Sequence, residues 1–427
     1  MSAPPEIIAP RHVERFQCIG SACEDDCCHG WRVSVDRDHA RRFLKVLDSP
    51  VERDRFRDAI EVQENWATNP QAYAILKRHD DGRCVYLDED RLCGVQKRHG
   101  GDVLWDTCAT YPRLFGRTGN RLEVWAAPSC PEVARQLLLH DDAIDLVALD
   151  RSHAVRTVLQ HDIAIEPTRA YERYLDDIRV TALRVLGTTR LSLGERLYLL
   201  MRLGDRTSAF FHRDAQTVDE RRLADELTLV THPDVHEIVR ASFAELPEEH
   251  SAVVRLLLGI LGQELKNQYS MGFGGLVKDV LRPAAAVGTA PGENSMTIDV
   301  STLTARYDER RDAWQAAQGE RLDRYFVNYS SAYWMREWYT HSPNLAVHGR
   351  RLLLRLALLR LLLLCHPKLD GVDPRAADAG SVLDATAVDA CYRLGRGLDH
   401  NVQLIEPIDR ALASGDVERL EKQLLRF

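Results

Sequence analysis

Apolar residues recur at every third or fourth position along most of the chain from about residue 150 onward. The segments 167–186, 251–265 and 321–339 show this spacing clearly, and it places apolar side chains on one face of an α-helix. Proline-containing triplets, HPD, SPN and HPK, separate the helical stretches, because proline interrupts a helix. The pattern predicts that residues 146–427 form a large all-helical domain.

The first 145 residues carry a mixed pattern of short elements. Residues 31–36 and 121–127 are predicted strands, and Pro131 opens a predicted helix over 131–139. Asp36 is expected to cap a helix over 37–48, because its carboxylate accepts hydrogen bonds from the first free N–H groups. Residues 84–95 are predicted to form a hairpin that turns at the acidic residues 88–90. The predicted fold is therefore mainly α, with a small cysteine-rich α+β metal-binding domain at 1–145.

One helical stretch, residues 350–366, is apolar enough to compare with a membrane span. Arg350, Arg351, Arg355 and Arg360 interrupt it, and no apolar run approaches the ~18 residues that a span requires. We expect a central buried helix whose arginines reach outward along their aliphatic stems. No membrane partner is expected.

Two glycine-rich stretches lie between predicted helices. Residues 271–279 are expected to form a helix-breaking turn, with a cofactor loop as the alternative. Residues 282–295 are expected to form a linker, with an active-site lid as the alternative. No Rossmann-type cofactor fingerprint is present.

Composition limits the predicted cellular location and the predicted classes of partner. The 427 residues carry a formal net charge of -8, and without a dominant basic patch we expect no nucleic-acid partner. The N-terminus lacks the basic and apolar regions of a signal peptide, so the predicted location is the cytoplasm. Because a reducing cytosol disfavours structural disulfides, clustered cysteines there indicate a metal site.

Eight of the ten cysteines lie in the first 130 residues. Their spacing is C-x4-C-x3-CC, followed after a long gap by C-x8-C-x14-C-x21-C. No C-x2-C pair of the kind common at zinc sites is present, whereas an iron–sulfur cluster accepts ligands from irregularly spaced loops. Zinc, mononuclear iron and thiol redox chemistry remain alternatives, as do one or two metal centres. Cys365 and Cys391 are expected to be packing residues.

The cysteine motifs resemble those of the flagellin lysine N-methylase family. The matching stretches are FQCIGSACEDDCCHGWRVSVD and CVYLDEDRLCGVQKRHGGDVLWDTCATYPR, with weaker similarity in RLDRYFVNYSSAYWM and DHNVQ. The opening is also similar to zinc- or iron-chelating cysteine-cluster domains. The cysteines that match the family's are Cys18, Cys23, Cys27, Cys28, Cys84, Cys93, Cys108 and Cys130.

This resemblance implies methylation of lysine ε-amines on flagellin. It implies S-adenosylmethionine as the methyl donor and an iron–sulfur cluster, of the 4Fe–4S type, as a cofactor, with zinc as the alternative metal. Methyl transfer requires an uncharged lysine, because an ammonium has no lone pair. The catalytic base is not assigned.

Polar residues near the motifs are candidates for cofactor or substrate contacts. Arg113 is placed to offer charge to sulfide or to a cofactor carboxylate, and Glu24 and Asp25 either position the cofactor or solvate a loop. Gly30 and Trp31 are expected to fix the loop's turn and packing. A polar stripe at Tyr325, Asn328 and Tyr329 forms either a substrate wall or core hydrogen bonds.

The sequence thus favours a protein-lysine N-methyltransferase with an iron–sulfur cofactor. A metal-binding accessory or scaffold protein, and a cluster-dependent enzyme acting on a small molecule, remain the alternatives.

Overall fold

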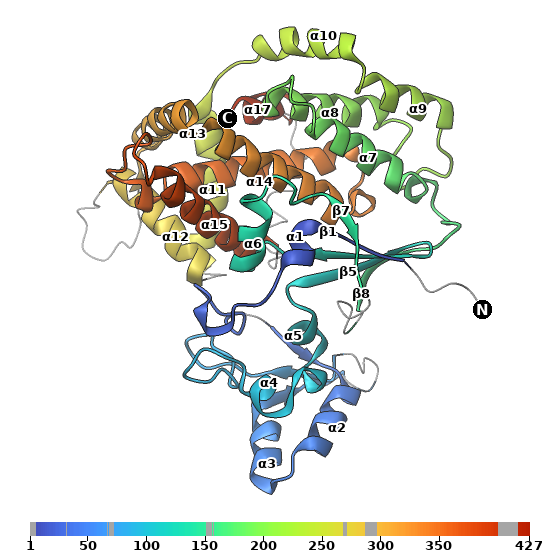
Figure 1. The fold of residues 1–427 in the computed structure, drawn as a ribbon, viewed down its shortest axis with the longest axis vertical. Helices are drawn as coiled ribbons and strands as arrows, with labels where there is room; N and C mark the ends of the chain where they lie inside the picture. The colour runs from blue at the N-terminus through green and yellow to red at the C-terminus, as the bar shows by residue number, and fades with distance from the viewer. Residues whose placement is uncertain are drawn as a thin grey trace.

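The computed structural model describes residues 6–30, 32–65, 67, 72–150, 156, 158–267, 271–286, 297–399 and 417–427. Figure 1 shows a large helical body, a mixed sheet along its lower side, and a small lobe that projects below the sheet. The predicted class, mainly α with a small α+β region near the N-terminus, is confirmed. Trp31 and residues 287–296 and 400–403, which carried expectations from the sequence, lie outside the described residues.

The small lobe contains short helices and a three-stranded antiparallel sheet of order β2-β4-β3. Its elements are η1 (Gly20–Ala22), β2 (Ser34–Val35), α2 (Arg37–Val46), α3 (Pro50–Ala59), β3 (Ile60–Val62), β4 (Ala74–Leu76), α4 (Gly94–His99), η3 (Gly101–Val103) and α5 (Asp106–Thr110). Asp36 caps α2 as predicted, accepting from the backbone N–H groups of residues 38 and 39. The Phe43 ring lies 5.0 Å from that of Phe56 and 5.2 Å from that of Trp105, centroid to centroid. This aromatic contact forms the core of the lobe.

A five-stranded mixed sheet of order β7-β1-β6-β5-β8 joins the lobe to the helical body. Its elements and flanking helices are β1 (Glu6–Pro10), α1 (Arg11–Arg15), β5 (Arg113–Thr118), β6 (Arg121–Ala126), α6 (Pro131–Leu138), β7 (Leu146–Ala148) and β8 (Leu159–Ile163). The strand predicted at 121–127 and the helix predicted at 131–139 are confirmed as β6 and α6. The predicted domain boundary at residue 145 falls within this sheet, because β7 and β8 follow it.

The helical body surrounds one central helix. Its elements are η5 (Ala170–Glu172), α7 (Leu175–Leu186), α8 (Leu193–Thr207), α9 (Glu220–Leu229), α10 (Pro233–Ala244), α11 (His250–Asn267), α12 (Met271–Leu281), η6 (Arg282–Ala284), β9 (Ala285–Ala286), β10 (Thr297–Ile298), α13 (Val300–Arg336), η7 (Tyr339–His341), α14 (Leu345–Leu364), η8 (Pro367–Leu369), α15 (Ala379–Leu398) and α17 (Val417–Arg426). Helices α8, α13, α15 and α17 pack against α14. Cys365 and Cys391 are buried in this core.

Helix α14 is buried as predicted, but its arginines do not reach outward. Arg350 pairs with Asp205 and Glu421, both at 2.9 Å, and Arg355 pairs with the buried Asp399. An arginine buried beside a carboxylate is stabilised without reaching solvent, so the expectation of extended stems was wrong. Among the described helices, none combines the length and apolar character that crossing a bilayer requires.

Two local predictions are corrected. Residues 271–279 lie in helix α12 and not in a turn, because Phe273, Leu276 and Val277 are buried at helical spacing. Residues 84–95 do not form a two-stranded hairpin. They form a single bridge, between Leu87 and Cys93, and helix α4 follows at once.

The crossing of α8 and α14 generates a stability prediction. A Cβ added at Gly204 would lie 2.6 Å from the backbone nitrogen of Ala346, so Gly204→Ala must push the two helices apart. We expect unfolding by urea to show a loss of about 1–3 kcal/mol. The control is Gly259→Ala on α11, where no atom lies within 4 Å, and which should stabilise the helix by roughly 0.5–1 kcal/mol. Equal effects of the two substitutions would contradict the packing.

Buried histidines generate a pH prediction. Burial lowers the pKa of His12 to about 4 and that of His348 to about 3, whereas both titrate near 6.5 when unfolded. The unfolded chain therefore takes up protons first as the pH falls, and stability is lost from pH 6.5 down to about 4. We expect His348→Gln to reduce the slope of unfolding free energy against pH by roughly 1 kcal/mol per pH unit in this window. An unchanged slope would show that His348 is protonated in the fold.

Candidate metal centre

Five of the predicted cysteines line one cavity of about 60 Å³ in the small lobe. They are Cys27, Cys28, Cys84, Cys93 and Cys108. The remaining lining is largely apolar and includes Val33, Leu76, Tyr86, Val95, Leu104, Trp105 and Tyr111. The cavity thus gathers thiols from three separate segments inside an apolar wall.

Backbone contacts bring these segments together. The Cys84 N–H donates to the Cys28 carbonyl at 2.8 Å, and the Gly30 N–H donates to the Gly82 carbonyl at 3.1 Å. Gly30 has φ of 78°, in the left-handed region that favours glycine. Its role in fixing the turn of the loop is therefore confirmed. The adjacent thiols of Cys27 and Cys28 both line the cavity because this loop is a turn and not a regular element.

The thiols in the cavity influence one another. A hydrogen bond with Cys28 lowers the pKa of Cys93 to about 6, and the contacts with Cys27 and Cys93 raise the pKa of Cys28. Burial raises the pKa of the Cys108 thiol. Thiolate is the form of cysteine that binds metal, so a cation in this cavity would favour the deprotonated state of each ligand.

The other three predicted cysteines form a second group. Cys130 precedes α6, and its thiol is close enough to Cys18 and Cys23 for their charges to raise its pKa, after the larger effect of burial. Arg113 lies beside this group, with its guanidinium 5.0 Å from the Phe16 ring centroid. Burial lowers the pKa of Arg113, and Cys18 and Cys130 act in the opposite direction. The eight cysteines are therefore divided into a set of five and a set of three.

The acidic loop that carries the first cysteines is held by arginines of the larger part of the protein. Arg396 on α15 pairs with Asp25 at 2.8 Å and donates to the carbonyl oxygens of Asp26 and Ser129. Arg135 on α6 pairs with Glu24. Glu24 and Asp25, proposed from the sequence as cofactor ligands, have these arginines as partners. Sequence reasoning missed Arg396 and Arg135, because nothing in the local pattern of α15 or α6 points to a loop so distant in the chain.

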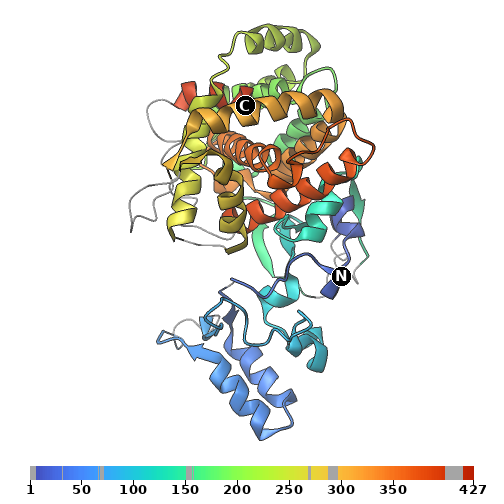
Figure 2. The same cartoon turned by 90° about the vertical axis from the view of Figure 1, so that its left-hand side faces the viewer.

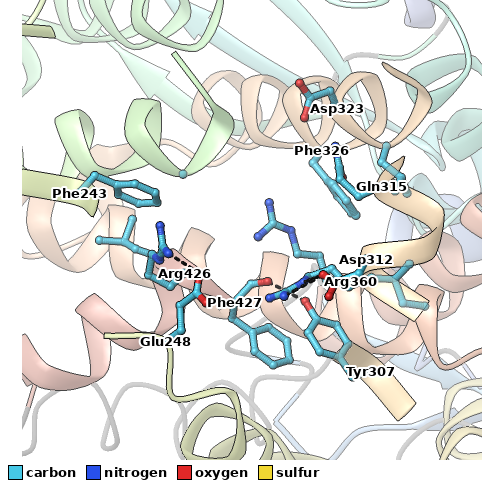
Figure 3. A pocket seen from close by; sticks show the side chains of 15 residues that line it. Phe243, Glu248, Tyr307, Asp312, Gln315, Asp323, Phe326, Arg360, Arg426 and Phe427 are labelled. Atoms are coloured by element: carbon cyan, nitrogen blue, oxygen red, sulfur yellow. Dashed lines mark hydrogen bonds and ion pairs between the residues drawn. The ribbon is translucent and has the colours of Figure 1, made fainter. Parts of the chain in front are cut away.

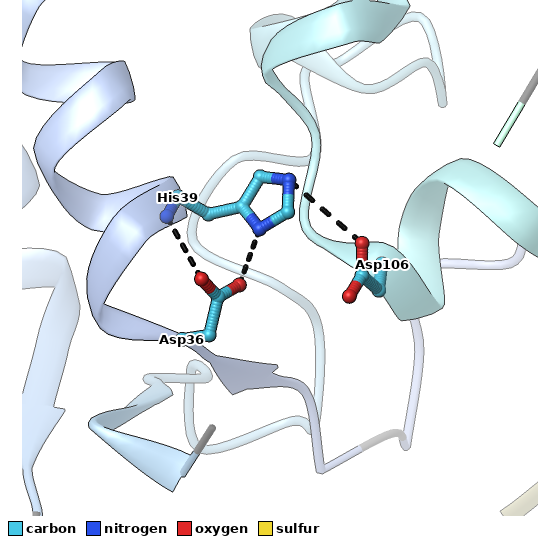
Figure 4. Close-up of side chains that lie close together, drawn as sticks. All are labelled: Asp36, His39 and Asp106. Atoms are coloured by element: carbon cyan, nitrogen blue, oxygen red, sulfur yellow. Dashed lines mark hydrogen bonds and ion pairs between the residues drawn. The ribbon is translucent and has the colours of Figure 1, made fainter. Parts of the chain in front are cut away.

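A second side-chain cluster braces the helix that carries Cys108. The His39 ring binds Asp36 through Nδ1, and its Nε2 lies 3.7 Å from Asp106, the first residue of α5 (Figure 4). Arg42 lies 2.9 Å from the same Nε2, and Arg156 lies 3.4 Å from Asp106. Because Arg156 pairs with Asp106 and Arg42 contacts the His39 ring, the cluster ties α2 to α5. Only the capping role of Asp36 was visible in the sequence.

The polar stripe on α13 makes core hydrogen bonds. Asn328 donates to the carbonyl oxygens of Leu137 and His140 at 2.9 and 2.8 Å, and the Tyr325 hydroxyl donates to Asp384. Tyr329 is buried on the same helix. Of the two roles considered for this stripe, the structure supports core hydrogen bonding.

Comparison with known proteins places the helical body in a family. Residues 179–425, more than half of the chain, match the model of the FliB lysine N-methylase C-terminal domain. The chain is 26% identical over 265 residues to the lysine-N-methylases of Salmonella typhimurium and Salmonella choleraesuis, covering 61% of this chain and 56% of each relative. It thus spans just over half the length of these relatives.

A shorter relative matches more closely. The flagellar biosynthetic protein FliU of Salmonella muenchen is 34% identical over 143 residues, which cover 33% of this chain and 81% of the relative. No solved structure matches the chain.

The contact between Arg396 and the acidic loop generates a stability prediction. Arg396→Met leaves Asp25 and two backbone carbonyls without their donor, and we expect urea unfolding to show a loss of about 1–3 kcal/mol. Arg57→Met on α3, an exposed arginine that pairs with Asp54 in its own helix, is the control and should change stability by less than about 0.5 kcal/mol. A double-mutant cycle with Asp25→Asn should give a coupling energy of about 1 kcal/mol or more. Additive effects would contradict a direct pair.

Proposed function

Because this chain belongs to the FliB lysine N-methylase family, we propose that it transfers methyl groups to lysine ε-amines of a protein substrate. The match over residues 179–425 carries the proposal, and the names of the two Salmonella lysine-N-methylases agree with it. A flagellar protein is the substrate we favour, because the shorter relative is a flagellar biosynthetic protein. The cytoplasm remains the predicted location.

We further propose that the five-cysteine cavity holds an iron–sulfur cluster. A zinc ion with Zn–S bonds of about 2.3 Å would place its sulfurs about 3.8 Å apart at the corners of a tetrahedron. Within the described ranges, no three cysteine sulfurs lie within 4.8 Å of one another. A cluster has several metal atoms and accepts more widely spaced ligands from separate loops, so the wider spacing supports it over a single ion.

The second cysteine group suits a supporting role or a second centre. Cys18, Cys23 and Cys130 lie beside Arg113, and a guanidinium near thiolates or sulfide stabilises negative charge. Arg113 remains our candidate for a cofactor carboxylate. The methyl donor we propose is S-adenosylmethionine.

The chain's own residues would control the state of the substrate lysine. Apolar residues around the cysteine cavity include Val33, Leu76 and Trp105, and apolar surroundings beside a bound cluster would lower the pKa of an approaching lysine by desolvation. An uncharged amine has the lone pair needed for in-line attack on the methyl group. The lobe's apolar core thus favours the reactive form of the substrate.

A structural metal is the second candidate function. Cys84, Cys93 and Cys108 pack against the lobe's hydrophobic core, which is where a metal that holds a small fold together would lie. In this case the lobe would be a scaffold, and the helical body would bind a partner.

Metal analysis and a transfer assay separate the two candidates. We expect protein purified without oxygen to contain iron with matching acid-labile sulfide, and to transfer labelled methyl groups from S-adenosylmethionine to flagellin. Cys93→Ser should reduce iron content and methyl transfer at least about tenfold, because it removes a ligand. The control is Cys365→Ala, since Cys365 is buried in the helical body and should leave the iron-to-protein ratio unchanged.

The results have distinct meanings. Iron loss with retained folding, as judged by circular dichroism, supports a functional cluster. Zinc without sulfide would contradict the cluster, and unfolding of the lobe in Cys93→Ser would favour the scaffold.

A further inference from the structure

Arg360, near the end of α14, is a partly buried arginine that lacks the partners of its neighbours. On the same helix Arg350 and Arg355 pair with carboxylates, and Arg351 donates to the Ser342 hydroxyl at 3.1 Å. Within the described part of the chain, Arg360 makes no hydrogen bond or ion pair, and its guanidinium lies 4.9 Å from the Phe326 ring centroid. A leucine at this position would continue the apolar run of the helix.

A charged side chain at position 360 costs free energy while no ligand is bound beside it. An arginine side chain keeps its charge in proteins, and burying a charge without a partner costs free energy. Burial lowers the pKa of Arg360, and the nearby Tyr307 and Asp323 only oppose this shift. Residues that break a local rule in this way are expected at binding sites.

The guanidinium borders a cavity of about 210 Å³ between α10, α13, α14 and the C-terminal residues (Figure 3). Apolar walls come from Phe243, Leu322, Phe326, Leu364 and Phe427. Two other arginines line the cavity, but Arg311 pairs with Asp312 and Arg426 pairs with Glu248. Arg360 is therefore the cation of this cavity that has its donors available, within the described residues.

We propose that this cavity binds the α-amino-acid group of a small molecule, with its carboxylate on Arg360. The planar guanidinium matches the two oxygens of a carboxylate. Asp312, Asp323 and Glu248 lie among the lining residues, and they disfavour a multiply charged anion while attracting an ammonium group. Phe243 and Phe326 offer contact to an apolar side chain.

The size of the cavity agrees with this class of ligand. Pockets for drug-sized molecules occupy roughly 300–1,000 Å³, and this one is smaller at about 210 Å³. A free apolar amino acid fits the volume, as does the methionine end of a larger molecule whose remainder lies outside. The amino-acid chemistry is argued from the cavity alone, and only the second source, the methyl donor, rests on the proposed function.

The site is separate from the cysteines. Figures 1 and 2 place the C-terminus at the top of the helical body and the lobe of α2, α3 and α4 at the bottom. A ligand here would therefore act on the helical body and not on the metal ligands directly.

Calorimetric titration of the full chain tests the site. L-Methionine, S-adenosylmethionine and S-adenosylhomocysteine are the probes, with inorganic phosphate and the deaminated analogue 4-(methylthio)butanoate for comparison. We expect Arg360→Leu to weaken binding about 10- to 100-fold, because it removes charged hydrogen bonds. Asp323→Asn should weaken binding of the amino acid but not that of the deaminated analogue.

Thermal unfolding without ligand provides an independent readout. Arg360→Leu should melt at the wild-type temperature or higher, since it removes a partly buried charge that has no ion-pair partner among the described residues. The matched control, Arg355→Leu on the same helix, should melt lower because it removes one of the two arginines that pair with Asp399. Arg360→Lys, which keeps the charge but not the planar fork, should bind less tightly than wild type.

Each outcome decides the proposal. Binding of L-methionine identifies a free amino acid, and binding only of the two S-adenosyl compounds identifies the methyl donor. Equal binding of phosphate, no binding of any probe at millimolar concentration, or destabilisation by Arg360→Leu equal to that by Arg355→Leu would overturn it. Failure here would leave the methyl-transfer assay and metal analysis unaffected, so the two proposals fail separately.

Discussion

The guanidinium of Arg396 makes the contacts on which the arrangement of the two cysteine groups depends. It comes from α15, near the end of the helical body, and reaches both Asp25 and the carbonyl of Ser129. These two residues lie beside the two groups of cysteines, one in the loop before Cys27 and the other next to Cys130. Because charged hydrogen bonds in a partly buried setting are strong and directional, one side chain fixes two ligand-bearing loops relative to the same helix. Arg396 therefore holds the two cysteine-bearing loops against the helical body.

The arginines of α14 lie in two different electrostatic environments. Along α14, Arg350 and Arg355 are buried against carboxylates and tie the central helix to α8, α17 and α15. Arg360 on the same helix lies over the Phe326 ring and makes no ion pair with any residue that the structure describes. The helix looks apolar in sequence, yet Arg350 and Arg355 form ion pairs along it. These ion pairs do not extend to Arg360, which borders the cavity beside the C-terminal residues.

Periodicity predicted the elements that depend on local sequence. It failed for segments whose conformation depends on packing against distant parts of the chain. The helices α7, α11 and α13, strand β6, the cap at Asp36 and the gathering of cysteines follow from spacing and side-chain type. The glycines of 271–279 suggested a turn, but burial of Phe273 against α15, where Gly397 leaves room for the ring, makes the segment helical.

The site shows the same division. The identity of the cysteines was readable from the motif, whereas their separation into five and three depends on the fold. The partners of Glu24 and Asp25 lie more than a hundred residues away, and no local pattern reveals them. Arg360 was noticed in the sequence only as an interruption of an apolar run.

The order of strands in the five-stranded sheet has a consequence for how the protein is made. β1 runs parallel to β6 and β5 runs antiparallel to it, with β6 between them, so the chain leaves β1 and returns into β5 at the same end of the sheet. The cysteine lobe is therefore an insertion between β1 and β5, and these two strands lie about 10 Å apart with β6 between them. During synthesis β1 has no partner until β6 has emerged, and by then every cysteine except Cys130 of the two groups has been translated. Closure of the sheet therefore follows synthesis of the whole lobe, so the thiols of the lobe are made before β1 has its first partner strand.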